Sequence, residues 1–399
     1  MTPSHLFLYG RTPALSAHEL QAVLARYSPA TELLSVRDEV GGVASDDVEL
    51  PLRVFHELGG ALKVLAVVAS QALSVGDDRQ TQLLTARTAL LETLYRELAT
   101  GGKAFAIGEV GFGQVDPLEL MDVKKELKAQ RIPSRFIKSP RTGLSAAVLL
   151  HQSVTEYIFV AGETTMYLAK TLAVQDIDDW TQRDRGKPYA NRRKGMLPPK
   201  LARIMVNLTQ LPTGACIYDP FCGTGTVLAE AMLAGYDVVG SDLDAEAVRG
   251  SQINLHWLQQ KYPETAARQA RIFTADVTQA STKELPNQVS AIVTEPFLGK
   301  QTPKAQELPN IFRGLTKLYL GAFRHWSTFL RPGAVVAIVL PIVPGNPASR
   351  YLESLIDKFA DLGYTAKFEP VTYARPEAVI QRQIFVFSYT GAPKVRTKE

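Results

Sequence analysis

Apolar runs and amphipathic stretches alternate regularly in the C-terminal half of the chain. Apolar runs stop at Asp219 and at Asp242, and two more, over residues 271–275 and 289–294, stop before Asp276 and Glu295. A fifth run covers residues 334–343, and helical periodicity separates the runs, most clearly over residues 245–258 and 314–330. Alternation of this kind predicts an α/β fold with an open, mostly parallel sheet. Two late runs, over residues 368–373 and 383–389, lie close together and predict an antiparallel last strand.

The N-terminal half is a mixture of short strand and helix patterns. Ser16 and Glu19 fit a capping box at the start of a helix over residues 16–26, and Gly59 with Gly60 ends a later helix. The further predicted strands cover residues 6–9, 31–36, 40–45, 61–69, 103–109, 134–137, 146–150 and 155–161, and the further helices cover 51–58, 81–99 and 117–130. We therefore expect α+β modules before the parallel sheet.

Composition places the chain among globular proteins of more than one domain. It has 399 residues, of which 46% are hydrophobic and 21% charged, and this length predicts two or three domains. Its longest apolar runs are too short to span a bilayer and no secretory signal precedes them, so we expect a cytoplasmic protein without membrane contact. Cys216 and Cys222 are the only cysteines, and the six histidines show no ligand spacing. We therefore expect neither a disulfide nor a bound metal.

A glycine turn follows the first apolar run of the C-terminal half. The sequence reads Asp219-Pro-Phe-Cys-Gly-Thr-Gly, so Gly223 and Gly225 fall where a buried strand must turn into a helix. Asp242 ends the next strand, 23 residues after Asp219, where an acid can bind ribose hydroxyls. A carboxylate at Asp219 would repel a pyrophosphate but suits a ligand with an ammonium and a sulfonium. The pattern favours S-adenosylmethionine over a nicotinamide dinucleotide.

Basic residues gather in two places. Seven lie within residues 124–141, where Glu126 is the only acid, and more lie in a connector over residues 175–207 that also carries Trp180 and Tyr189. Such runs are often ordinary solvated surface, but cations beside a cofactor pocket and aromatic rings that can stack on bases favour nucleic-acid binding. The candidate RNA contacts are Lys124, Lys125, Lys128, Arg135, Arg183, Arg185, Arg192, Arg193 and Lys194.

The connector and the glycine turn together resemble a known family. The sequence RDRGKPYANRRKGMLPPKLARIMVNL, followed by DPFCGTGTVLAEA, is similar to the THUMP-domain tRNA guanosine-10 N2-methyltransferases. This resemblance implies a ferredoxin-like module over residues 1–60, a THUMP RNA-binding domain over 61–170 and a basic linker with a helix over 171–208. It further implies a Rossmann-like methyltransferase domain over residues 209–392, followed by a tail over 393–399.

The resemblance also implies roles and partners. The cofactor is S-adenosylmethionine and the partner is tRNA, and the family allows for a small activator subunit. Glu295, Pro296 and Phe297 would be the catalytic residues at the end of the fourth strand. The residues implied to bind the cofactor are Asp219, Phe221, Gly223, Gly225, Asp242, Leu243, Asp276 and Met196.

The catalytic tetrad departs from the family pattern. Enzymes that methylate an exocyclic amine usually have Asp/Asn-Pro-Pro-Tyr/Phe, whereas this chain has Glu295-Pro296-Phe297-Leu298. Glu295 keeps an acceptor for the amine hydrogens, and Phe297 is the aromatic ring left to stack on an extruded base. We expect methylation of the N2 amine of a guanosine in tRNA. The alternatives are methylation of another RNA or DNA amine and a non-catalytic tRNA-binding subunit.

Overall fold

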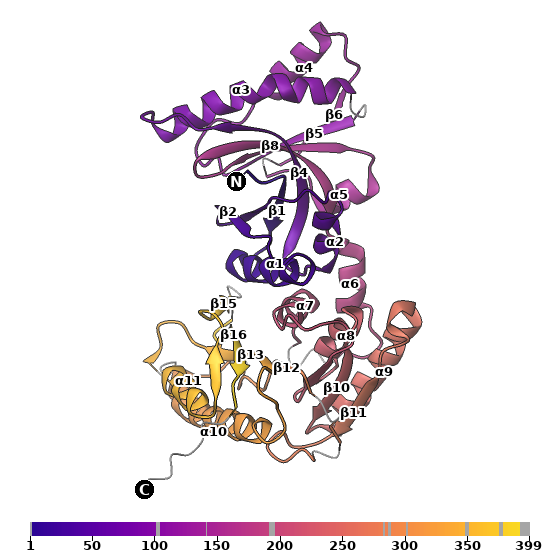
Figure 1. Cartoon of the computed structure of the whole chain (residues 1–399), viewed down its shortest axis with the longest axis vertical. Helices are drawn as coiled ribbons and strands as arrows, with labels where there is room; N and C mark the ends of the chain where they lie inside the picture. Colours follow the sequence, from indigo (N-terminus) through magenta and orange to yellow (C-terminus); the bar gives the residue numbers. More distant parts are fainter. Residues whose placement is uncertain are drawn as a thin grey trace. The chain divides into compact units, whose positions relative to one another are not determined.

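The computed structural model divides the chain into two compact units, Met1–Asp179 and Trp180–Glu399. Figure 1 shows the elements of each unit, which are considered separately below. The structure describes residues 2–100, 104–140, 142–190, 196–281, 284–285, 289–300, 302–347, 351–374 and 378–391.

The first unit is built on one mixed sheet of eight strands, in the order β2-β3-β1-β4-β8-β7-β5-β6. Its strands are β1 (His5–Tyr9), β2 (Leu33–Arg37), β3 (Val40–Val43), β4 (Ala61–Ala72), β5 (Ala104–Val110), β6 (Arg135–Phe136), β7 (Thr155–Ala161) and β8 (Thr165–Val174). Its helices are α1 (Pro13–Tyr27), α2 (Leu50–Glu57), α3 (Arg79–Thr100), α4 (Leu120–Ala129) and α5 (Ala146–His151). The long strand β4 pairs with β1 on one side and with β8 on the other.

Helices cover this sheet by burying apolar stripes. On α3, Leu83, Leu90 and Leu94 recur at helical spacing and pack with the inward residues of β5, β7 and β8. On α1, Leu20 and Leu24 pack with residues of β1 and β4 in a separate cluster. The predicted division at residue 60 falls just before β4, and the assignments of residues 1–60 and 61–170 to named domains stay predictions.

Two local predictions in this unit are wrong. Residues 146–150 form helix α5 and no strand, because Ser145 caps the segment by accepting a hydrogen bond from the Val148 amide at 3.5 Å. Ser16 and Glu19 make no capping box, since α1 already begins at Pro13. The buried Glu19 carboxylate instead accepts hydrogen bonds from the amides of Gly59 and Gly60, both at 2.8 Å, and so holds the segment that follows α2.

The second unit alternates strands and helices. Its strands are β9 (Cys216–Asp219), β10 (Asp237–Asp242), β11 (Ala270–Thr274), β12 (Ala291–Thr294), β13 (Val335–Ile342), β14 (Tyr364–Ala366), β15 (Val371–Tyr373) and β16 (Gln381–Tyr389). Its helices are α7 (Pro199–Asn207), α8 (Thr226–Leu233), α9 (Ala245–Lys261), α10 (Leu308–Trp326) and α11 (Tyr351–Asp361), with short 3-10 turns η2 (Pro263–Thr265) and η3 (Ala305–Glu307). Helix α7 confirms the helix predicted after Pro198 and Pro199.

The sheet of this unit has the order β11-β10-β9-β12-β13-β16-β14, with β15 paired to β16. Strands β9 to β13 run parallel and β16 is antiparallel to β13. This confirms the predicted Rossmann-like α/β fold with its antiparallel ending. After β9 the chain continues to β10 on one side and reaches β12 on the other, so the sheet has a switch point at the carboxyl end of β9, where ligands bind in folds of this kind.

The connector holds a helix that the sequence pattern did not predict. Helix α6 (Ile177–Arg185) begins with Asp178 and Asp179 and ends with Arg183 and Arg185, a charge order that suits the helix dipole. In the described part of the chain, no helix has the length and apolar character needed to cross a bilayer.

Candidate active site

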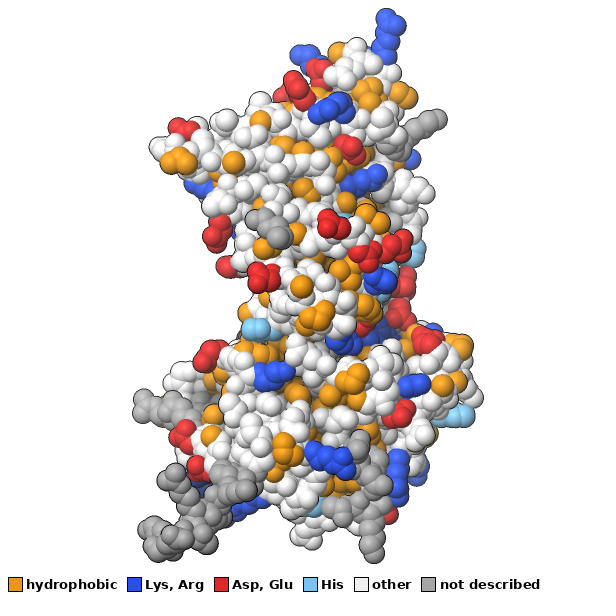
Figure 2. All heavy atoms as spheres, viewed as in Figure 1, with side chains coloured by type: hydrophobic (Ala, Val, Ile, Leu, Met, Phe, Trp, Pro, Cys, Tyr) orange, Lys and Arg blue, Asp and Glu red, His pale blue; other side chains and the backbone are white. Residues whose placement is uncertain are grey.

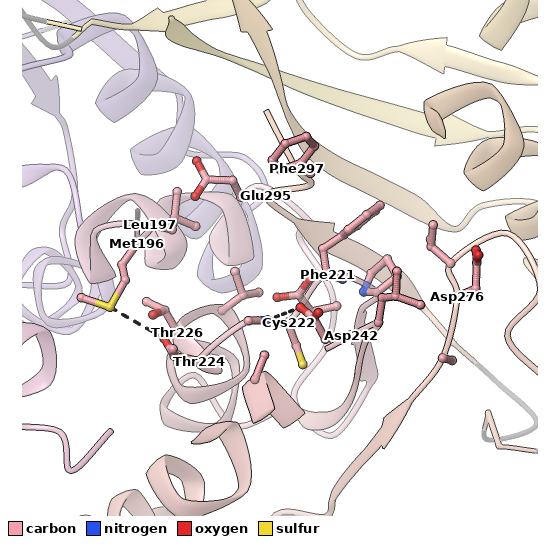
Figure 3. A pocket seen from close by; sticks show the side chains of 18 of the residues that line it. Met196, Leu197, Phe221, Cys222, Thr224, Thr226, Asp242, Asp276, Glu295 and Phe297 are labelled. Carbon is pink, nitrogen blue, oxygen red and sulfur yellow. Dashed lines mark hydrogen bonds between the residues drawn. The ribbon is translucent and has the colours of Figure 1, made fainter. Parts of the chain in front are cut away.

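A cavity of about 730 Å³ lies at the carboxyl ends of the parallel strands in the second unit. Asp219, Asp242 and Asp276 line it, as does Glu295, so residues that follow four separate strands meet there as predicted. Figure 3 shows Glu295 and Phe297 on one side of the cavity and Asp276 on the other. We call the side with Glu295 and Phe297 the acceptor end, and the side with the glycine turn, Asp242 and Asp276 the cofactor end.

The glycine turn between β9 and α8 needs residues without side chains. Gly223 and Gly225 have φ angles of 51° and 82°, in the left-handed region that other residues rarely adopt. A Cβ on Gly225 would also lie 2.4 Å from the hydroxyl of Ser251 on α9. The turn therefore brings bare backbone against the cavity, and a ligand can lie directly on it.

Backbone amides hold the acids of the cofactor end. Asp242 accepts from the amides of Gly223 and Asp244, each at 2.9 Å, so one carboxylate ties the glycine turn to the end of β10. Asp276 accepts from the Thr278 amide at 2.8 Å and from its hydroxyl at 2.7 Å. These two hydrogen bonds from Thr278 lower the pKa of Asp276. Both acids are pre-positioned to accept from a ligand.

Asp219 lines the cavity and is almost fully buried. It is 2% exposed and accepts from the Thr294 hydroxyl at 2.6 Å and from the Phe221 amide at 3.1 Å. Burial raises its pKa to about 7, and the neighbouring charges of Asp242 and Glu295 act in the same direction. Asp219 therefore loses its proton most easily when a cation lies close to it.

The other predicted cofactor residues also line the cavity. Phe221 belongs to the lining, and Leu243 does so with a side chain that is 73% exposed. Met196 lines it too, and its sulfur lies 3.8 Å from the hydroxyl of Thr224 in the glycine turn (Figure 3). Seven of the eight predicted cofactor residues thus line one cavity, and the eighth, Gly225, belongs to the glycine turn but not to the lining.

Tyr189 belongs to this cavity, although its sequence context suggested base stacking. Its amide donates to Asn254 and its hydroxyl to Glu246, both at 2.9 Å. Its ring covers Gly250, where a Cβ would lie 2.3 Å from the ring. The sequence gives no signal for this packing, because Tyr189 and Gly250 are far apart in the chain.

At the acceptor end, Glu295 is held by a distant side chain. The Arg382 Nε on β16 donates to Glu295 Oε1, and the two side chains are 13% and 14% exposed. Phe297 is 63% exposed and lines the cavity, while its carbonyl accepts from the buried Tyr319 at 2.7 Å. Pro296 is buried outside the lining. The tetrad thus presents an oriented carboxylate and an accessible aromatic ring.

The predicted RNA contacts fall into three groups. Lys124, Lys125 and Lys128 are exposed on α4. Arg135 of β6 and Arg185 of α6 are exposed as well. Arg183 is different, because its side chain is 8% exposed and binds Glu230 of α8 at 2.6 Å, which makes it an internal ion-pair residue and corrects its assignment to the surface. Arg192, Arg193 and Lys194 lie outside the described residues. Figure 2 shows Lys and Arg mixed with acidic side chains on the face in view.

The cavity fits a cationic nucleoside ligand. Its charged lining residues are all carboxylates, which favour a sulfonium and an ammonium, and the glycine turn admits a ligand against the backbone. Exposed apolar side chains such as Leu243 can cover a flat adenine ring. Within the described ranges, no group of three or more His, Cys, Asp or Glu residues is arranged to hold a metal ion. These properties match S-adenosylmethionine.

Comparison with known proteins agrees with this fit. Residues 189–334 match the family described as "RMKL-like, methyltransferase domain". The chain is 35% identical over 194 residues to the tRNA (guanine(10)-N2)-dimethyltransferase of Methanothermobacter thermautotrophicus, covering 48% of this chain and 50% of that one. It is 33% identical over 116 residues to the "Probable tRNA (guanine(10)-N2)-dimethyltransferase" of Methanothermococcus thermolithotrophicus, covering 29% of this chain and 70% of that one.

A solved structure supports the fold over nearly the whole chain. TrmN from Thermus thermophilus aligns with a TM-score of 0.56 at 18% identity, covering 96% of this chain and 99% of that one. The sequence matches are shorter, and the chain spans about half the length of the first curated relatives that it matches. From the methyltransferase-domain match and the archaeal relatives, the chain belongs to the family of S-adenosylmethionine-dependent methyltransferases that contains the tRNA (guanine(10)-N2)-dimethyltransferases.

Proposed function

We propose that this protein transfers a methyl group from S-adenosylmethionine to the N2 amine of a guanosine in tRNA, at position 10. The observation that carries the proposal is the acceptor end, where an oriented carboxylate and an exposed aromatic ring flank the cofactor cavity. The names of the archaeal relatives support the choice of tRNA guanosine over other amines.

The residues of the acceptor end have separate tasks. When bound, the cofactor supplies an electrophilic methyl group on a sulfonium, so this chain has to position a weakly nucleophilic amine. Phe297, with its ring exposed, stacks on the extruded base. Glu295 accepts a hydrogen of the amine and takes up the proton that the amine loses. Its Oε1 is engaged by Arg382, so Oε2 faces this task.

The cofactor end binds and orients. Asp242 accepts from ribose hydroxyls while its own bonds to Gly223 and Asp244 keep the turn in shape. Asp276 accepts from the adenine amino group, and Asp219 faces the positive charges of the ligand. Because each acid already has a protein donor, little reorganisation is needed when the ligand binds.

In the first unit, the exposed lysines of α4 are the proposed tRNA-binding surface. Lys124, Lys125 and Lys128 are exposed on one helix, and Arg135 of β6 is exposed as well. Each contact with a phosphate releases counterions, so changing one of these lysines to Gln should weaken tRNA binding and reduce the slope of log affinity against log salt by about 1. Titrations at several salt concentrations measure this, and an unchanged slope would show that the lysines are ordinary solvated surface.

The activity is tested by nucleoside analysis. Unmodified tRNA transcripts are incubated with the protein and isotope-labelled S-adenosylmethionine, and their digested nucleosides are separated by mass spectrometry. We expect labelled N2-methylguanosine or N2,N2-dimethylguanosine, and no label when position 10 is changed to adenosine. Label at another guanosine would refute the position, and cofactor binding without any labelled guanosine would refute the reaction.

A further inference from the structure

Lys187 in the connector is a buried cation. Lys187 is only 8% exposed, and its Nζ donates a hydrogen bond to the Thr226 hydroxyl at 3.0 Å. Among the described residues, Lys187 has no carboxylate within ion-pair distance. Burial lowers the pKa of this amine, while the charges of Asp184 and Glu230 act in the opposite direction. A neutral hydroxyl balances no charge, so a ligand anion beside Thr226 would stabilise the ammonium.

The nearby carboxylates are already in use. Glu230 on α8 is 1% exposed and binds both Arg183, at 2.6 Å, and Arg203, at 3.0 Å. Asp184 lies 3.8 Å from Arg185 and is 42% exposed. Two arginines therefore already share the Glu230 carboxylate, and Lys187 adds a further positive charge. Burial of an unbalanced charge is costly, and a bound anion would offset that cost.

Thr226 links this cation to the cofactor cavity. It is the first residue of α8 and lines the cavity next to the glycine turn (Figure 3). The first turn of a helix also offers amides that favour an anion. The charged residues of the lining are all acids, and Lys187 lies behind Thr226 and is not itself part of the lining. Thr226 is therefore the lining residue beside which a ligand carboxylate would find a cation.

S-adenosylmethionine has charges that match this division. Its amino-acid portion carries an ammonium, which suits the acidic lining, and a carboxylate, which needs a cation and donors. We propose that Lys187 and Thr226 bind the carboxylate of the amino-acid portion of the cofactor. This assignment rests on the proposed methyltransferase function and names the residues that recognise one group of its ligand. A purely structural role, in which Lys187 only fastens the connector to α8, is the competing interpretation.

Ligand truncation separates these two interpretations without any turnover. S-adenosylhomocysteine carries the carboxylate, whereas 5′-methylthioadenosine lacks the whole amino-acid portion. We expect Lys187→Met to weaken binding of S-adenosylhomocysteine by about 10- to 100-fold, because a charged hydrogen bond is lost, and to leave 5′-methylthioadenosine within about twofold. Isothermal titration calorimetry of the full chain measures both affinities. Thr226→Val should show the same selectivity with a smaller loss.

Lys200→Met is the matched control. Lys200 is also in the connector region, with its amine 5.6 Å from the Trp180 ring centre, and it does not line the cavity. The control should leave the affinities for both ligands unchanged. An equal loss for both ligands in Lys187→Met would overturn the proposal in favour of the structural role, and no loss for either would overturn it as well.

A comparison on the unaltered protein covers the case in which the variant does not fold. If the proposal holds, the wild-type chain binds decarboxylated S-adenosylhomocysteine at least tenfold more weakly than S-adenosylhomocysteine; equal affinity for the two would refute it. Failure of the wild-type chain to bind any of these nucleosides would instead refute the proposed function itself, so the two failures are distinguishable.

Discussion

At the cofactor end of the cavity, backbone amides of adjacent turns hold Asp242 and Asp276, whereas at the acceptor end a single side chain from a late strand holds Glu295. Asp276 is fixed by Thr278, two residues on, and Asp242 by Asp244 and the glycine turn. Glu295 depends on Arg382, 87 residues away in the sequence. The first arrangement is a property of the fold, and the second depends on one long-range pair. The two ends should therefore respond differently to substitution.

The largest effect is expected from Glu295→Gln. Glutamine keeps the size of the side chain but cannot take up the amine proton, so kcat should fall on the order of 100-fold, while the affinity for S-adenosylhomocysteine stays within about twofold. Single-turnover kinetics and calorimetry measure the two quantities. Glu264→Gln, at an exposed acid of η2, should change neither. Equal losses in turnover and cofactor affinity would remove the distinction between the two ends.

The next effect is expected from Asp242→Asn at the cofactor end. Loss of the charged acceptor should weaken S-adenosylhomocysteine binding by about 1 to 3 kcal/mol, and kcat at saturating cofactor should change little. Asp244→Asn is the matched control, because Asp244 caps α9 by accepting from the Glu246 amide but does not line the cavity. It should lower thermal stability without a selective loss of affinity. An effect of Asp242→Asn on kcat alone would contradict its place at the cofactor end.

The same contrast explains which parts of the site the sequence could predict. The glycine turn, Asp219, Asp242 and Asp276 follow from local patterns, since each acid ends a strand or follows it within two residues. Arg382 could not be paired with Glu295 from sequence, because their contact depends on how β16 lies against β13. The burial of Lys187 in the basic connector could not be predicted either, because charge alone does not show that a side chain is buried.

The fold shows a similar division. Long periodic segments, such as those that form α3 and β13, were predicted with small errors at their ends. The short run at residues 146–150 fits a strand or a helix by its apolar pattern, and the Ser145 cap decides for the helix. Glu19 matched a capping box, but its carboxylate binds two amides 40 and 41 residues away. Where local sequence signals were weak, contacts outside the segment therefore determined its structure.

A smaller effect is expected when Arg382 is removed. Arg382→Met leaves Glu295 without its orienting partner, so kcat should fall on the order of tenfold, less than for loss of the carboxylate itself. Arg382→Lys keeps a cation at the position and should recover part of the rate, and cofactor affinity should change in neither variant. Rate measurements at saturating tRNA and cofactor decide this. A wild-type rate in Arg382→Met would show that the pair does not position Glu295.

The smallest effect concerns pH and Asp219, which feels the charges of both Asp242 at the cofactor end and Glu295 at the acceptor end. Its pKa is raised from 3.8 to about 7, so the folded chain holds this proton more tightly than the unfolded chain does. Without ligand, the contribution of Asp219 to the free energy of unfolding is therefore greatest at low pH and is lost as pH rises from about 4 to 7. A cationic ligand reverses this preference, because it favours the charged carboxylate.

Binding of S-adenosylmethionine must then displace a proton from Asp219 below pH 7. The apparent affinity should rise about tenfold between pH 6 and pH 8 and level off above, with up to one proton released near pH 6. Calorimetry in buffers of different ionisation enthalpy measures that proton. Asp219→Asn should remove the pH dependence, whereas Asp242→Asn should keep it at lower affinity. If the pH dependence survives in Asp219→Asn, another group titrates. A flat wild-type profile would mean that the positive charges of the ligand do not approach Asp219.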